Sequence, residues 1–227
     1  MFPLFVVGSL LVLGGLAWAT YLSGRLLKSI PLHENLLLAP IENVVKGALV
    51  ALCVGLGLLS GLAPAQLGWV SIAPARDLAL GLGVGLVAQV VVNRLTLWAI
   101  AHYGKAIYSP VVMKNIYPRR RRDWLLVPAA MLLAVVLEEL LFRSLLLGGL
   151  GTIVPPLVLV VLLGAVFGWM HSPQGTLGMV GTGGLGILLS LLFLVTGSLL
   201  APLVAHYLIN MLQLLRARED WRWLQEY

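Results

Sequence analysis

The chain has 227 residues, of which 60% are hydrophobic and only 11% are charged, and its formal net charge is +6. Soluble domains carry about 25% charged residues, and a chain of this size cannot hide such an apolar excess in a water-soluble core. The composition excludes an ordinary soluble enzyme and predicts a protein that folds in lipid. The basic excess indicates membrane orientation, and we expect no nucleic-acid partner. The single cysteine, Cys53, excludes an intramolecular disulfide and is expected to be a small buried residue.

Apolar segments of membrane-spanning length follow one another along the chain. A transmembrane helix needs roughly 17–25 mostly apolar residues, and about seven segments come close to this length. They cover approximately residues 2–22, 44–63, 78–100, 124–147, 155–171, 176–195 and 198–215. Glycine and proline clusters separate several of them. We therefore expect an all-α fold, a polytopic transmembrane bundle of about seven helices in contact with the lipid bilayer.

The basic residues are concentrated in alternate connections between the expected spans. The first and second long loops and the C-terminal segment hold most of them, namely Arg25, Lys28, Lys46, Lys105, Lys114, Arg119, Arg120, Arg121, Arg122, Arg216, Arg218 and Arg222. About seven spans place these regions on one side, and basic loops favour the cytoplasm. The pattern predicts an outside N-terminus and a cytoplasmic C-terminus in the plasma membrane, or in the inner membrane of a prokaryote.

Two glycine patterns indicate close helix packing. Gly81 and Gly85 have the G-x-x-x-G spacing that lets helices approach within a bilayer. The run from Gly181 to Gly186 fits the dinucleotide-binding motif G-x-G-x-x-G, but it lies in an apolar span with no strand before it. We therefore assign both patterns to packing.

Ionisable side chains are costly inside a bilayer and usually mark a functional site. The spans at 124–147, 155–171 and 198–215 concentrate them, together with one amide: Glu138, Glu139, Arg143, His171, His206 and Asn210. Glu139 and Arg143 are i and i+4 with the acid first, the favourable order for an ion pair on a helix. Glu138 points about 100° away around the helix and is left without this partner, so we expect it to serve as a general base.

The remaining polar residues complete a plausible catalytic set. His206 and Asn210 are i and i+4 on one helix face, and His171 ends its span before a Ser-Pro break. Glu138 and His171 together can deprotonate a water molecule, while His206 and Asn210 can donate hydrogen bonds to an oxyanion. Glu138 lies roughly 21 Å along its span by helix rise. For Glu138 and His171 to meet, either the span with His171 must break inside the bilayer or the span with Glu138 must begin outside it.

The motifs Glu138-Glu139-x-x-x-Arg143, Phe167-x-x-x-His171 and His206-x-x-x-Asn210, in this order, resemble the CPBP or Abi family. These CAAX-protease and bacteriocin-processing membrane proteins are related to type II CAAX prenyl endopeptidases. The resemblance covers about residues 120–215. It implies variable transmembrane helices over 1–110 and a catalytic helical core over 111–215 with a conical cavity open to the cytoplasm. From the basic residues, we expect 216–227 to form a cytoplasmic tail.

By this resemblance, Glu138 activates water with the help of His171, and His206 and Asn210 stabilise the oxyanion. Glu139, Arg143 and Phe167 would support the site. The function it implies is an intramembrane endopeptidase for a peptide or protein substrate that can carry a lipid.

The sequence is also compatible with several alternatives. The glutamate scheme needs no metal, whereas a zinc ion held by Glu138, His171 and His206 is the alternative. A transporter would use the same buried polar residues as a proton or ion relay. A non-catalytic membrane immunity or interaction protein would keep them for structure.

Overall fold

The computed structural model describes residues 1–29 and 35–219, and within these ranges all regular secondary structure is helical. The long helices are α1 (Phe2–Ser29), α2 (Pro40–Leu59), α3 (Pro74–Tyr103), α5 (Asp123–Glu139) with its continuation η3 (Leu140–Gly149), α6 (Pro156–Met170), α7 (Gly175–Thr196) and α8 (Leu200–Glu219). The short elements are η1 (Leu36–Leu38), η2 (Lys105–Ile107), α4 (Val111–Ile116) and η4 (Ser172–Gln174). The all-α bundle predicted from the sequence is confirmed.

Most of the long helices can cross a membrane. By length and composition, 5 segments qualify, namely Phe2–Leu26, Pro40–Leu59, Pro74–Tyr103, Asp123–Gly149 and Ser172–Thr196. The helix α6 is apolar but shorter, and α8 is more polar because it carries His206, Asn210 and Gln213. Large apolar side chains such as Leu11 and Leu157 are exposed on the outside of the bundle, where lipid would contact them. The chain is a multi-pass integral membrane protein.

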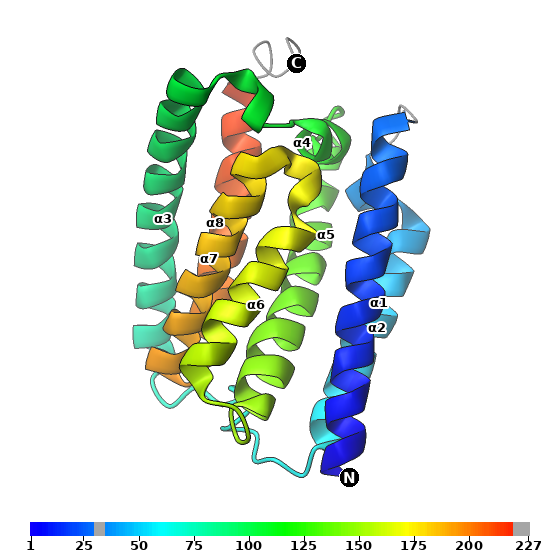
Figure 1. Ribbon diagram of the computed structural model, residues 1–227, viewed down its shortest axis with the longest axis vertical. Helices are drawn as coiled ribbons and strands as arrows, with labels where there is room; N and C mark the ends of the chain where they lie inside the picture. The colour runs from blue at the N-terminus through cyan, green and yellow to red at the C-terminus, as the bar shows by residue number, and fades with distance from the viewer. Residues whose placement is uncertain (30–34, 220–227) are drawn as a thin grey trace.

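Successive long helices run in alternate directions, so α1 begins at one end of the bundle and α8 ends at the other (Figure 1). The connections α1–α2, α3–α5 and α6–α7 therefore lie at the same end as the last turn of α8. The connections α2–α3, η3–α6 and α7–α8 lie at the opposite end. This arrangement matches the alternation assumed in the sequence prediction, although residues 220–227 of the predicted tail, with Arg222, lie outside the described residues.

The helix formed by α5 and η3 occupies the centre of the bundle. Every residue from Leu140 to Leu147 is buried, and the apolar side chains among them pack in one cluster with Phe5, Cys53 and Phe193. The segment η3 is a π-helix, a wider turn that is rare and often found at functional sites. The sequence predicts one regular helix here and gives no sign of this change. Cys53 is a buried core residue, as expected.

Both glycine patterns lie at close helix contacts, as predicted. A Cβ atom on Gly81 would lie 2.6 Å from the carbonyl oxygen of Ala201, and one on Gly85 would lie 3.1 Å from that of Ala205. These two glycines therefore allow α8 to pack closely against α3. In the second pattern, Gly183 lies against Gly168 of α6. A Cβ atom on Gly168 would lie 2.9 Å from the Cα atom of Gly183. Close packing thus fixes the helices that carry the candidate site residues.

Three helices begin earlier than predicted from the sequence. The helix α2 starts at Pro40, α3 at Pro74 and α5 at Asp123. Asp77 therefore lies inside the first turn of α3, where it is fully buried and accepts hydrogen bonds from Ser71 (2.6 Å) and Arg76 (2.8 Å). An acid at a helix N-terminus is favoured by the helix dipole. This cluster secures the α2–α3 loop.

Candidate active site

Glu139, the last residue of α5, accepts two hydrogen bonds on one carboxylate oxygen. Its Oε1 lies 3.0 Å from Nη1 of Arg143 and 2.7 Å from Nδ1 of His206. Glu139 is fully buried, and Arg143 and His206 are also buried. A carboxylate already paired with a guanidinium can only accept, so Nδ1 of His206 is the donor. Glu139 therefore fixes the orientation of the His206 ring.

Glu138 lies on the other side of the same imidazole. Its Oε2 is 3.6 Å from Nε2 of His206, and its side chain is 33% exposed. Glu138 is thus less buried than expected, and it faces His206. The two neighbouring glutamates border opposite nitrogen atoms of one histidine. Glu139 is tightly hydrogen-bonded to it, and Glu138 lines an adjoining cavity.

Arg143 connects the central helix to α7. Its Nη2 donates to the carbonyl oxygen of Gly186 at 3.0 Å, and its guanidinium carbon lies 5.2 Å from the centre of the Phe167 ring. Phe167 is buried and its ring also packs edge-on against His206, with ring centres 5.9 Å apart. Arg143 and Phe167 therefore pack around the Glu139–His206 contact, and Phe167 also lines the cavity beside it.

His171 follows the last residue of α6. Its Nδ1 is 2.8 Å from the carbonyl oxygen of Phe167, and the two rings pack at a tilt of 44° with centres 4.6 Å apart. The helix α6 has only 15 residues. Its turn into α7 lies deeper in the bundle than the ends of α3 and α8 at the same side (Figure 1). Of the two ways to bring His171 to the depth of Glu138, the structure favours the break of this span inside the bundle.

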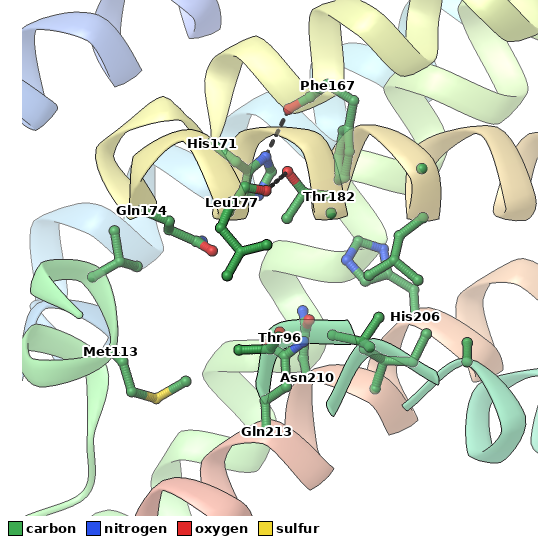
Figure 2. Close-up of a pocket in the computed structure, with 18 of the residues that line it drawn as sticks. Thr96, Met113, Phe167, His171, Gln174, Leu177, Thr182, His206, Asn210 and Gln213 are labelled. Atoms are coloured by element: carbon green, nitrogen blue, oxygen red, sulfur yellow. Dashed lines mark hydrogen bonds between the residues drawn. The ribbon is translucent and has the colours of Figure 1, made fainter. Parts of the chain in front are cut away.

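A cavity of about 1320 Å³ contains all four predicted catalytic residues in its wall. Glu138, His171, His206 and Asn210 line it from α5, the end of α6 and α8. Figure 2 shows His171 on one side of this space and Asn210 with Gln213 on the other. The amide of Asn210 has one weak partner, the Met131 sulfur at 3.5 Å, and so keeps donor capacity for a ligand.

The geometry does not form the alternative zinc site. Within residues 1–29 and 35–219, no three His, Cys, Asp or Glu side chains are arranged to hold a metal ion. Glu138 and His206 face each other, but His171 does not complete a ligand set with them. A zinc site needs three such ligands at about 2.0–2.2 Å from the ion.

The helix α3 adds polar residues to the cavity that were not predicted from the sequence. Asn93 and Thr96 line it, and Gln89 donates a hydrogen bond from Nε2 to Oδ1 of Asn93 at 2.9 Å. These residues match no motif, and α3 was assigned to the variable part of the chain. The signal that could have found them is two amides at i and i+4 within an apolar span, because polar groups inside a membrane usually have a function.

Comparison with known families identifies the region that holds this site. Residues 120–212 match the family model of Rce1-like type II CAAX prenyl endopeptidases. The matched region includes all the motif residues from Glu138 to Asn210, so the predicted relationship to CAAX proteases is confirmed. The comparison with curated proteins found no match, and neither did the comparison with solved structures.

Proposed function

We propose that this Rce1-like protein is an intramembrane endopeptidase in which Glu138 activates a water molecule for attack on a peptide bond. The observation that carries the proposal is the placement of His206 between two glutamates. Glu139 holds Nδ1 at 2.7 Å, while Nε2 faces Glu138 and the cavity. A buried ion pair thus fixes the ring and leaves one nitrogen and one carboxylate available to a substrate.

Glu138 acts as the general base in this proposal. Its partial exposure lets the carboxylate contact water in the cavity, whereas Glu139 is completely enclosed. His171 lines the same cavity, and the contact of its Nδ1 with the Phe167 carbonyl leaves Nε2 for the water molecule. Glu138 accepts a proton as the water oxygen bonds to the carbonyl carbon. A positioned base contributes about 10²–10⁴-fold to such a step.

His206 and Asn210 stabilise the oxyanion. With Nδ1 donating to Glu139, a protonated His206 presents a second N–H from Nε2 into the cavity. The positive ring is compensated because carboxylates lie on both sides of it. The Asn210 amide donates beside it. When the tetrahedral intermediate collapses, Glu138 returns its proton to the leaving amine, giving a free carboxylic acid and an amine. Each oxyanion donor contributes about 10²–10³-fold.

The cavity also supports entry of a lipid-bearing substrate from the bilayer. Val87 and Val91 on α3 and Val180 on α7 line it, yet they are 65%, 47% and 66% exposed. Side chains that line a cavity and remain this exposed border its opening. The opening lies between two membrane-spanning helices, so it faces lipid. We propose a peptide carrying an isoprenoid near its C-terminus as the substrate class.

The proposed orientation places the α3–α5 connection and the end of α8 in the cytoplasm. Basic residues gather at this end of the bundle, and the described connections at the opposite end have Arg76 in the first turn of α3. Positively charged segments stay on the cytoplasmic side. His171 lies at the end of α6 on this same side, so the site would be reached from the cytoplasm and from the bilayer.

The test is cleavage of an internally quenched peptide with a farnesylated cysteine near its C-terminus by purified protein in liposomes. Glu138→Gln keeps the side-chain shape and removes the base, so it should abolish cleavage and leave the melting temperature unchanged. Glu42→Gln, at an acid on α2 that pairs with Lys46 outside the cavity, is the matched control and should cleave normally. Near-normal cleavage by Glu138→Gln would exclude the mechanism.

A further inference from the structure

The helix α3 contributes a polar pair to the cavity, although it lies outside the region that matches the family. Gln89 and Asn93 are one turn apart, and Gln89 Nε2 donates to Asn93 Oδ1 at 2.9 Å. Gln89 is 5% exposed, and its Oε1 is a buried oxygen without a hydrogen-bond partner among the described residues. Burying an amide without its full set of hydrogen bonds is unfavourable. An apolar span that retains such a pair therefore calls for a functional explanation.

The hydrogen bond determines which end of the Asn93 amide faces the cavity. Because Oδ1 accepts from Gln89, the Nδ2 amino group is the part of Asn93 that remains to be satisfied. Asn93 lines the cavity, whereas Gln89 lies behind it. The cavity wall therefore presents two N–H donors at this position, which suit a carbonyl or carboxylate oxygen.

The register between α3 and α8 gives the height of Asn93 relative to the oxyanion donors. The two helices run in the same direction, with Gly81 beside Ala201 and Gly85 beside Ala205. Continuing this register by two turns places Asn93 at the level of Gln213. Asn210 precedes Gln213 by three residues, so it is roughly 4.5 Å lower along the axis. An extended peptide advances about 3.3 Å per residue. For a peptide that runs along the helix axis, this offset corresponds to one or two substrate residues between Asn93 and Asn210.

We propose that Asn93 is a substrate-binding residue for the peptidase reaction, held in place by the positioning residue Gln89. It donates an N–H to a carbonyl or carboxylate oxygen of the peptide, one or two residues from the scissile bond. This inference rests on the proposed function, because it takes the bond to be cleaved at Asn210. It assigns part of the substrate specificity to a helix outside the family-matched core.

The experiment measures binding separately from cleavage. In the Glu138→Gln background, fluorescence anisotropy would follow a labelled farnesylated peptide, prepared with a free C-terminal carboxylate and with a C-terminal amide. Asn93→Ala should raise Kd about three- to tenfold, the range for one lost hydrogen bond. Val90→Ala, on the lipid-facing side of α3, is the control and should leave Kd unchanged. A loss confined to the free acid identifies the carboxylate as the acceptor, and an equal loss identifies a backbone carbonyl.

The role of Gln89 has its own readout. Gln89→Leu should raise Kd less than Asn93→Ala does, and the double variant should match Asn93→Ala alone, because Gln89 acts only through Asn93. With Glu138 intact, Asn93→Ala should raise KM and leave kcat unchanged. Binding of the peptide without any cleavage would reject the proposed function and leave the Asn93 contact standing. If Asn93→Ala cleaves normally with unchanged Kd and KM, the Asn93 contact is rejected and the proposed function stands. If the peptide does not bind the Glu138→Gln protein at all, the Asn93 contact is rejected as well.

Discussion

The Nδ1 atom of His206 lies 2.7 Å from Oε1 of Glu139, so a residue of α8 is held directly by the last residue of α5. The same oxygen pairs with Arg143, which donates in turn to the Gly186 carbonyl of α7. One buried carboxylate thus connects three helices. This arrangement makes Glu139 important for stability and for the site, and it can be tested apart from Glu138.

Replacing Glu139 by alanine should destabilise the protein strongly. The change leaves Arg143, which is 1% exposed, and His206 without their common partner. An unpaired buried charge costs about 3–5 kcal/mol. We therefore expect a large decrease in melting temperature in mild detergent, measured by differential scanning fluorimetry, and loss of peptide cleavage in the same preparation.

Two controls distinguish charge from general damage. The double variant Glu139→Leu with Arg143→Leu removes both charges and should be more stable than Glu139→Ala, because no unpaired cation remains. Glu42→Ala breaks a partly exposed i,i+4 pair with Lys46 and should cost about 0–1 kcal/mol. A Glu139→Ala protein that melts at the wild-type temperature would show that the ion pair does not support the fold.

Replacing Asn210 should slow turnover while the protein stays folded. Its amide lines the cavity and has one weak contact, with Met131, so little packing energy depends on it. Asn210→Ala removes one oxyanion donor and should lower kcat about 10²–10³-fold. Asn210→Asp keeps the shape but replaces the donor by an acceptor, so its rate should fall at least as far. Stopped assays on the quenched peptide would measure both, and equal kcat in wild type and Asn210→Ala would remove this residue from the proposal.

Much of this arrangement follows from the sequence, because lipid imposes simple rules. Spans are long apolar runs, and costly polar residues stand out within them, so the helices and the set from Glu138 to Asn210 were identified without a structure. The ion pair of Glu139 with Arg143 followed from their spacing. The contact of Glu139 with His206 did not, because it joins residues 67 positions apart and depends on how α8 packs.

Helix packing also explains the other features that the sequence analysis missed. The π-helical turns of η3 lie where the central helix is buried on all sides, and no local sequence motif predicts them. A role for Gln89 and Asn93 can be inferred only from the packing of the helices. The glycines of α3 bring that helix against α8, and the C-terminal half of α3 then borders the cavity. Three-dimensional packing, more than local propensity, decides which polar residues share a space.

The contact between α3 and α8 gives a third prediction. A methyl group on Gly81 would meet the Ala201 carbonyl oxygen at 2.6 Å, whereas one on Gly83 would have no atom within 4 Å. Gly81→Ala should therefore separate the helices and cost about 1–3 kcal/mol. Gly83→Ala should be neutral or slightly stabilising, because alanine is the better helix former. Thermal melting of the two variants, which differ by two positions on one helix, would measure this, and equal melting temperatures would contradict the close contact.

The last prediction concerns orientation, and the single buried cysteine makes it practical. Cys53 is fully buried, so in a Cys53→Ala background one introduced cysteine reports on one end of the bundle. Ala65 lies in the exposed α2–α3 loop, and Arg121 lies in the exposed connection before α5 at the opposite end. A membrane-impermeant maleimide added to intact cells should label Ala65→Cys, because the basic end stays in the cytoplasm. It should label Arg121→Cys only after permeabilisation. The reverse pattern would invert the topology, and with it the proposal that the site is reached from the cytoplasm.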